Sequence, residues 1–171
     1  LDGTGNPRYR GDVLIVGDRI GRVGVIPDGE VPADAREVDV AGLAIMPGFI
    51  DPHSHAAGGL ASAELSHARP LLAQGITTVF VNPDGGGPVD LVAQRGQLLE
   101  HGLGVNVAQL VGHGSIRSTV IGRDDRAPTA DELDRMRALA REAMEQGAFG
   151  LSSGLFYAPG SYAEIGEVVE L

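Results

Sequence analysis

Two histidines separated by a single residue stand where an apolar segment ends. The segment 43–50 leads into Asp51, and His53 and His55 follow directly. In an extended chain, side chains two positions apart project to the same side. Two imidazoles at a strand end can share a divalent ion, and Zn²⁺ suits such nitrogens well. The spacing therefore predicts the start of a metal site, the alternative being two loop histidines bonded to the backbone.

Asp84 is a third candidate ligand, and it follows the next apolar segment. The β-branched run at 76–82 leads into Pro83, Asp84 and Gly85. Pro-Asp-Gly is a natural turn, so a purely structural role is one interpretation. The other is that the carboxylate binds the same ion as the histidines, or orients a substrate, because it ends a neighbouring strand.

Four later side chains are candidates for substrate contact. His113 is flanked by two glycines that favour an exposed imidazole, and Arg117 in the same predicted loop could bind a carboxylate through two parallel hydrogen bonds. Ser152 and Tyr157 offer hydroxyl groups in a glycine-rich segment. The alternatives are a structural histidine, a solvated arginine and a tyrosine that packs its own loop.

Alternating strands and helices would bring these positions to one edge of a sheet. The expected strands lie near 44–50, 76–82, 104–112 and 148–153, and the expected helices near 61–74, 89–101 and 129–147. The last helix opens with a capping box at 129–132. This alternation is typical of an α/β protein with a parallel sheet, whose working residues lie at the carboxyl ends of the strands.

The chain length sets how much of such a fold is present. A complete (β/α)₈ barrel takes about 250 residues, and this chain has 171. We therefore expect the first four βα units of a TIM-like barrel at 44–171, an incomplete half. Residues 1–43 predict separate β-structure, with a hairpin between the apolar runs 13–16 and 20–26 and a short strand at 36–42.

Composition limits the classes of partner. The formal net charge of −10 disfavours binding to nucleic acid, and no apolar run approaches the roughly 20 residues of a membrane helix. The chain has no cysteine, so neither a disulfide nor a thiolate ligand is available. The cytoplasm is the default location, and composition gives no expectation about oligomeric state.

Four segments resemble the amidohydrolase superfamily. "GLAIMPGFIDPHSHA" is similar to the first barrel strand of these enzymes, and "GDVLIVGDRIGRVG" to the small β-sandwich that they build from both ends of the chain. "GHGSIR" and "GAFGLSSGLFYAPGSYA" resemble the D-aminoacylases, which are N-acyl-D-amino-acid deacylases. The resemblance implies that 1–43 is part of that β-sandwich domain.

The resemblance also implies a reaction and its residues. It implies zinc-dependent hydrolysis of a small-molecule substrate, an N-acyl-D-amino acid. The bond cleaved is a C–N bond other than a peptide bond, and the site would hold one or two ions of Zn²⁺. The implied metal ligands are His53 and His55, with Asp84 at the position of a further ligand. The substrate contacts expected from the residue types are His113, Arg117, Ser152 and Tyr157. In the family, the general base is an Asp after the last barrel strand, and further His ligands follow strands five and six. No catalytic base is therefore expected within 1–171, which looks like an N-terminal fragment.

The chain departs from the family at one position. Many D-aminoacylases carry a cysteine ligand after the second strand, where this chain has Asp84. A carboxylate can replace a thiolate, but it is harder and can bridge two ions. The number and identity of the metal ions stay open, as does the substrate preference that the cysteine-containing members would imply for this chain.

Two alternatives to a D-aminoacylase are considered. One is a hydrolase of cyclic amides, similar to dihydroorotases and hydantoinases, and the segment "SSGLFYAPG" argues against it. The other is a barrel that has lost its metal site and serves as a non-catalytic subunit, and the retained His53 and His55 argue against that.

Half a barrel would leave two open sheet edges and an uncovered apolar interior, which favours aggregation. We therefore expect residues 1–171, produced alone, to be poorly soluble and inactive on N-acyl-D-amino acids. Size-exclusion chromatography, thermal unfolding and an amine-release assay check this. A monodisperse, cooperatively folding preparation that cleaves amides would contradict it.

Overall fold

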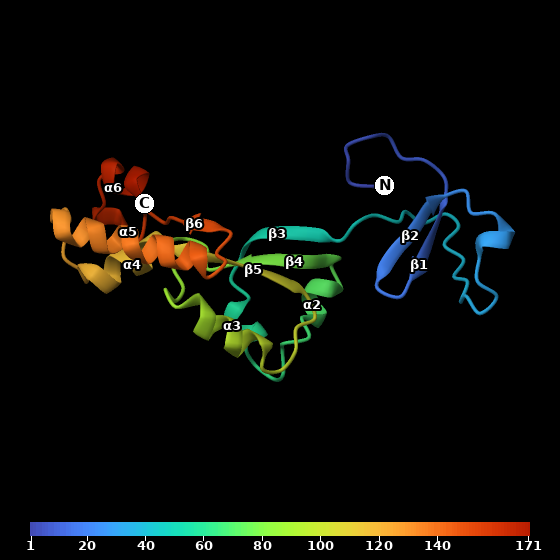
Figure 1. The fold of residues 1–171 in the computed structure, drawn as a ribbon, viewed down its shortest axis with the longest axis horizontal. Helices are drawn as coiled ribbons and strands as arrows, with labels where there is room; N and C mark the ends of the chain where they lie inside the picture. The colour runs from blue at the N-terminus through green and yellow to red at the C-terminus, as the bar shows by residue number, and fades with distance from the viewer. The chain divides into compact units, whose positions relative to one another are not determined.

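The first of two compact units is a small β-structure. The computed structural model describes residues 1–171 and divides them into Leu1–Pro47 and Gly48–Leu171 (Figure 1). In the first unit, β1 (Asp12–Val16) and β2 (Arg19–Gly24) form the predicted antiparallel hairpin. A single 3₁₀ turn, η1 (Asp28–Glu30), follows. That this unit is part of a β-sandwich domain ending at residue 43 stays a prediction.

The short strand expected at 36–42 is not formed. Residues 31–48 contain turns but no regular helix or strand. The backbone N–H of Ala41 binds the side chain of Asp39 at 2.8 Å instead of a neighbouring strand. The β-propensity of the two valines in this segment is therefore not enough, because a strand needs a partner for its backbone groups.

The second unit is built on a four-stranded parallel sheet. Its strands are β3 (Phe49–Ser54), β4 (Ile76–Val81), β5 (Asn106–Gly112) and β6 (Gly150–Ser152). They lie in chain order, so β3 and β6 are the two edges. The α/β alternation and all four strand positions expected from the sequence are present, although β3 begins at Phe49 rather than near 44. It also ends at Ser54 rather than near 50, so His53 lies within the strand.

Six helices accompany the sheet. They are α1 (Ala57–Leu60), α2 (Arg69–Leu72), α3 (Leu91–Leu99), α4 (His113–Val120), α5 (Ala130–Glu145) and α6 (Ile165–Glu170). The single helix expected at 61–74 is wrong, because only the short turns α1 and α2 form near it. Ala68 adopts a left-handed φ of 51°, and Pro70 in the first turn of α2 has no N–H to continue an earlier helix. No helix of the structure has the length and apolar character needed to cross a membrane.

The helix caps follow the sequence closely. Asp90 accepts a hydrogen bond from the N–H of Ala93 at 2.9 Å and begins α3. The capping box predicted for α5 is confirmed: Thr129 Oγ1 accepts from the N–H of Glu132 at 3.3 Å, and the Glu132 carboxylate accepts from the N–H of Thr129 at 2.8 Å. These bonds satisfy donors that the first helical turn leaves free.

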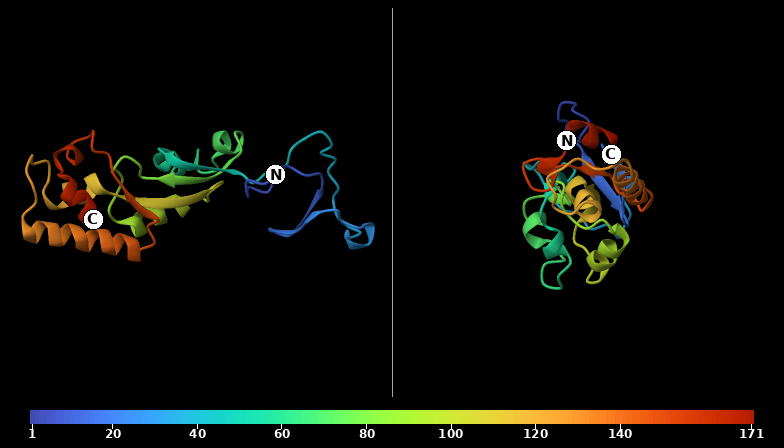
Figure 2. Two further views of the ribbon diagram at one scale, coloured as in Figure 1. Left: turned by 90° about the horizontal axis from the view of Figure 1, so that it is seen from above. Right: turned by 90° about the vertical axis from the view of Figure 1, so that its left-hand side faces the viewer.

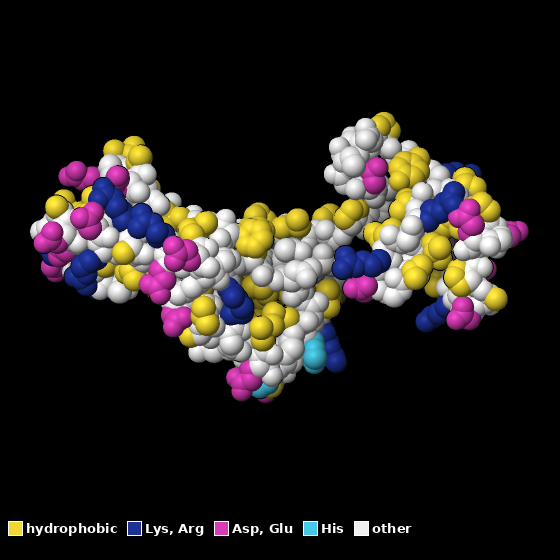
Figure 3. All heavy atoms as spheres, in the orientation of Figure 1, with side chains coloured by type: hydrophobic (Ala, Val, Ile, Leu, Met, Phe, Trp, Pro, Cys, Tyr) yellow, Lys and Arg dark blue, Asp and Glu magenta, His cyan; other side chains and the backbone are white.

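The core of the second unit consists of two apolar clusters. One joins α3, α4 and α5 to the ends of β5 and β6, and α4 and α5 lie side by side in both sets of views (Figures 1 and 2). The other packs α1, α3 and the α2 region against β4. Apolar side chains remain exposed over the strands, including Phe49, Ile50 and Phe149, and the space-filling view shows such side chains at the surface there (Figure 3). The sheet therefore has more apolar surface than its own helices cover.

Removing the cap of α5 should weaken the second unit measurably. We expect Thr129→Ala to lower the free energy of unfolding by about 1 kcal/mol, because the N–H of Glu132 loses its acceptor. Thr119→Ala is the matched control, since Thr119 lies exposed within α4 and alanine favours a helix interior. Urea unfolding monitored by circular dichroism compares them, and equal stability of both variants would contradict the prediction.

Candidate metal centre

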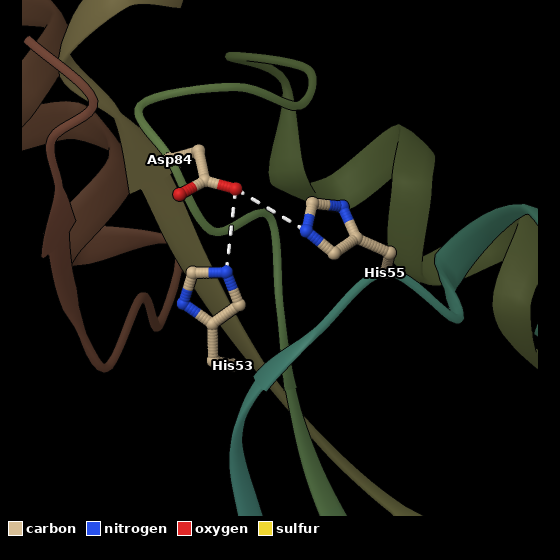
Figure 4. A group of neighbouring side chains, drawn as sticks. All are labelled: His53, His55 and Asp84. Carbon is tan, nitrogen blue, oxygen red and sulfur yellow. Dashed lines mark ion pairs between the residues drawn. The ribbon is translucent and has the colours of Figure 1, made fainter. Parts of the chain in front are cut away.

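The carboxyl ends of β3 and β4 bring three candidate ligands together. His53 lies in β3 and His55 one residue beyond it, and Ser54 between them is buried. Asp84 lies in the turn after β4. Its Oδ2 atom is 3.3 Å from Nε2 of His53 and 3.2 Å from Nε2 of His55, and both rings face it (Figure 4). The imidazole nitrogens of both histidines thus lie near one carboxylate oxygen atom of Asp84.

The separations of these atoms fit ligands of one metal ion. Two ligand atoms bound to Zn²⁺ at about 2.0–2.1 Å lie about 3.3 Å apart at a tetrahedral angle. The two N–O separations match this value, and the three ligand atoms all lie within 4.8 Å of one another. Two imidazole nitrogens and one carboxylate oxygen are a common donor set for Zn²⁺. The residues therefore fit a divalent ion of this kind.

The site is open to solvent on the side of the histidines. The side chains of His53 and His55 are 58% and 71% exposed, whereas that of Asp84 is 33% exposed. Three protein ligands also leave a coordination position free. The arrangement thus has room for water, substrate or further ligands.

The end of β3 is irregular where it delivers His53. The pairing with β4 shifts between Asp51 and Ser54. Pro52 has no N–H to give to a neighbouring strand, and the N–H of His53 binds the Asp51 carboxylate at 3.1 Å. Asp51 therefore stabilises the backbone that presents the first histidine.

The turn that carries Asp84 packs backbone against backbone. A Cβ atom on Gly112 would lie 2.3 Å from the carbonyl oxygens of Gly85 and Gly86, and one on Gly154 would lie 2.0 Å from the carbonyl oxygen of Asp84. No side chain fits at either position. Gly112 therefore serves close packing of the turn against β5, and not the exposure of His113 that the sequence suggested.

A cleft of about 380 Å³ adjoins two of the ligands. It is lined by Ser54, His55, Ala57, Asn82, Pro83, Asp84, Gly86, Gly87 and Tyr157. Tyr157 is 56% exposed and is the one phenolic side chain among these. Of the four residues expected to contact substrate, Tyr157 is thus the one that the structure places at the cleft.

His113 and Arg117 lie elsewhere than the sequence predicted. Both belong to α4 rather than to a loop, and both side chains are completely buried, so the expected exposure is wrong. Nε2 of His113 is 2.9 Å from Glu167 Oε1, and the Arg117 guanidinium donates to Oε2 of the same carboxylate. Being four residues apart on a helix, the two side chains share the face that meets α6. Their contact with substrate stays a prediction.

Ser152 is also buried, and it supports the turn of Asp84. Its hydroxyl donates to the carbonyl oxygen of Asn82 at 2.7 Å and accepts from the N–H of Gly85 at 3.1 Å. The side chain thus bridges both sides of Asp84. Its predicted contact with substrate is likewise untested by the geometry.

Sequence reasoning missed several buried polar residues around the site. Glu167 is 5% exposed, and the amides of Asn82, Gln94 and Gln109 are between 5% and 8% exposed. Two signals were available. Gln94 has the helical spacing of the buried Leu91 and Leu98, and Gln109 stands within an otherwise apolar strand. A polar residue in such a position has to find a partner in the core.

Loss of the Glu167 carboxylate should destabilise the second unit strongly. We expect Glu167→Ala to cost about 3–5 kcal/mol, because it leaves the Arg117 guanidinium buried without its partner. Glu170→Ala, on the same helix, removes a 40% exposed carboxylate paired with Arg137 and should cost less than about 1 kcal/mol. Urea unfolding of both variants decides the matter, and similar losses for the two would refute the role of burial.

The chain is similar in sequence to known proteins of one family. The model of a family described as "Amidohydrolase family" matches residues 36–165. The chain is similar to a D-aminoacylase of Alcaligenes xylosoxydans xylosoxydans, with 35% identity over 196 residues that cover 100% of this chain and 39% of the relative. The chain therefore spans about two fifths of that relative's length.

Two solved structures resemble the chain closely. One is a D-aminoacylase with a binuclear metal centre whose functional role was studied. Its TM-score is 0.85, and it is 34% identical over 99% of this chain and 40% of that one. The other is the N-acyl-D-glutamate deacylase of Bordetella bronchiseptica with zinc and a phosphonate inhibitor, with a TM-score of 0.79 and 32% identity over 99% of this chain and 40% of that one. The predicted α/β fold, half of a barrel sheet, is confirmed by these matches.

Proposed function

This chain belongs to the amidohydrolase family, and on that premise we propose that the protein hydrolyses the amide bond of N-acyl-D-amino acids at a metal centre held by His53, His55 and Asp84. The observation that carries the proposal is the convergence of both imidazoles on Asp84 Oδ2 at 3.2–3.3 Å. The D-amino acid substrate is supported by the relatives, which are a D-aminoacylase and an N-acyl-D-glutamate deacylase.

The donor set supports Zn²⁺ as the metal. When bound, the ion would polarise the amide carbonyl and lower the pKa of a water ligand to about 7. Asp84 presents Oδ2 to both histidines, and its other oxygen points away from both rings (Figure 4). Because a carboxylate can bridge two ions, that second oxygen supports a centre of one or two ions, in keeping with the binuclear centre named for the D-aminoacylase.

In this proposal, residues 1–171 orient the substrate and hold the metal, and they do not supply the group that transfers the proton. Tyr157 lines the cleft beside His55 and Asp84, where its phenol can hold a polar group of the substrate. Asp84 is the sole carboxylate among the lining residues and is engaged by both histidines. Following the resemblance to D-aminoacylases, the proposal assigns the general base to an Asp after the last barrel strand, outside 1–171, and expects these residues alone to be inactive.

An assay of the intact natural protein tests the proposal. We would measure free-amine release from matched N-acetyl-D- and N-acetyl-L-amino acids, with dihydroorotate and hydantoin in parallel. We expect cleavage of D-substrates only, loss of activity on chelation and its return with Zn²⁺. His53→Ala and His55→Ala should each reduce kcat/KM at least about 100-fold, because each removes a metal ligand.

The matched controls are His67→Ala and His101→Ala, two exposed histidines outside the cleft, which should retain full activity. Cleavage of the cyclic amides alone would reject the substrate assignment and keep the metal chemistry. No bound metal and no activity on any of these compounds would reject the proposal as a whole.

A further inference from the structure

A buried network of side-chain amides lies behind the turn that carries Asp84. Asn82 Nδ2 donates to Gln94 Oε1 at 2.9 Å, and Gln94 Nε2 donates back to Asn82 Oδ1 at 2.8 Å. Gln109 Nε2 donates to the same Gln94 oxygen at 2.7 Å. The three residues come from the end of β4, from α3 and from β5. The network therefore joins the turn to the two elements beside it.

Main-chain groups fix the network in place. Asn82 Nδ2 also donates to the carbonyl oxygen of Leu110 in β5 at 2.9 Å, and Gln109 Nε2 donates to that of Leu91 in α3 at 3.1 Å. Strand and helix backbones of this kind are the most rigid parts of a domain. A buried amide that lost its partner would carry a desolvation penalty, so the bonds hold one another in a single arrangement.

The backbone that the network supports is left-handed at two residues. Asn82 has φ of 65° and Asp84 has φ of 58°, a region that Asn and Asp adopt more readily than the other residues with a Cβ atom. Such conformations persist where the surroundings determine them, and they gather at functional sites. The amide pair determines the backbone at Asn82, and the Ser152 hydroxyl bonds to the main chain on both sides of Asp84. The backbone that carries the Asp84 side chain is therefore held by its neighbours.

We propose that Asn82 and Gln94 are positioning residues of the metal centre. Their reciprocal amide pair holds the left-handed turn, and the turn brings Asp84 Oδ2 to the two histidines. Both amides are engaged by each other, and Asn82 is also bound to the backbone of Leu110. The inference rests on the proposed function, because it concerns the same metal centre. It adds that buried side chains behind the ligands determine where the ligands lie.

The test measures metal affinity rather than activity. In the intact natural protein, Gln94→Leu keeps the approximate volume of the side chain and removes the amide oxygen and nitrogen that pair with Asn82. We expect its affinity for Zn²⁺, measured by competition with a chromophoric chelator, to fall about 10- to 100-fold, as is typical when groups that orient ligands are lost. Gln97→Leu is the matched control, an exposed glutamine on the same helix, and its affinity should stay within about twofold of the unaltered protein.

A second variant covers the case in which Gln94→Leu does not fold. Asn82→Gly removes the amide while glycine still adopts the left-handed conformation, and it should weaken Zn²⁺ binding to a similar extent. The visible spectrum of Co²⁺ bound at the site should also shift in each folded variant. A role in folding alone would leave both the affinity and the spectrum of a folded variant unchanged.

The outcomes separate the two proposals. Normal Zn²⁺ binding by the unaltered protein, with equally tight binding by folded Gln94→Leu or Asn82→Gly, overturns the positioning role alone. No Zn²⁺ binding by the unaltered protein rejects the proposed metal centre itself, and the positioning role with it. A selective loss in these variants, with Gln97→Leu unaffected, supports both.

Discussion

The close approach of the Asp84 turn to the ends of β5 and β6 is the constraint on which the site depends. Gly112 and Gly154 meet carbonyl oxygens of the turn so closely that neither position has room for a Cβ atom. This contact sets where the turn can lie, and the parallel pairing of β3 with β4 sets where the histidines can lie. The distances between the candidate ligands follow from these two backbone relations.

Much of this arrangement could be predicted from local sequence patterns. The spacing of His53 and His55 and the strand-end position of Asp84 depend only on the period of a strand and on the sharing of one edge by parallel strands. The caps at Asp90 and Thr129 are equally local, since each bonds within three residues. Patterns of this range do not require knowledge of which elements pack together.

The rest could not be predicted, because it depends on partners far away in the chain. Glu167 reaches His113 across 54 residues, and Ser152 reaches Asn82 across 70. Glycines beside His113 look the same in sequence whether they expose a side chain or admit a neighbouring backbone. The segment 36–42 has strand-forming residues, but whether it becomes a strand depends on a pairing partner that its own residues do not specify.

The backbone packing around Asp84 implies that the ligand position tolerates substitution, whereas the glycine positions around it do not. The turn is held by main-chain contacts, by a serine hydroxyl and by amides, none of which bonds to the carboxylate itself. Position 84 can therefore exchange one short donor side chain for another, a thiolate for a carboxylate, without a change of fold. Gly112 and Gly154 beside it cannot be substituted in this way, because neither has room for a Cβ atom. Divergence of metal preference among proteins built this way would then proceed by single substitutions at the ligand, while the surrounding backbone stays constant.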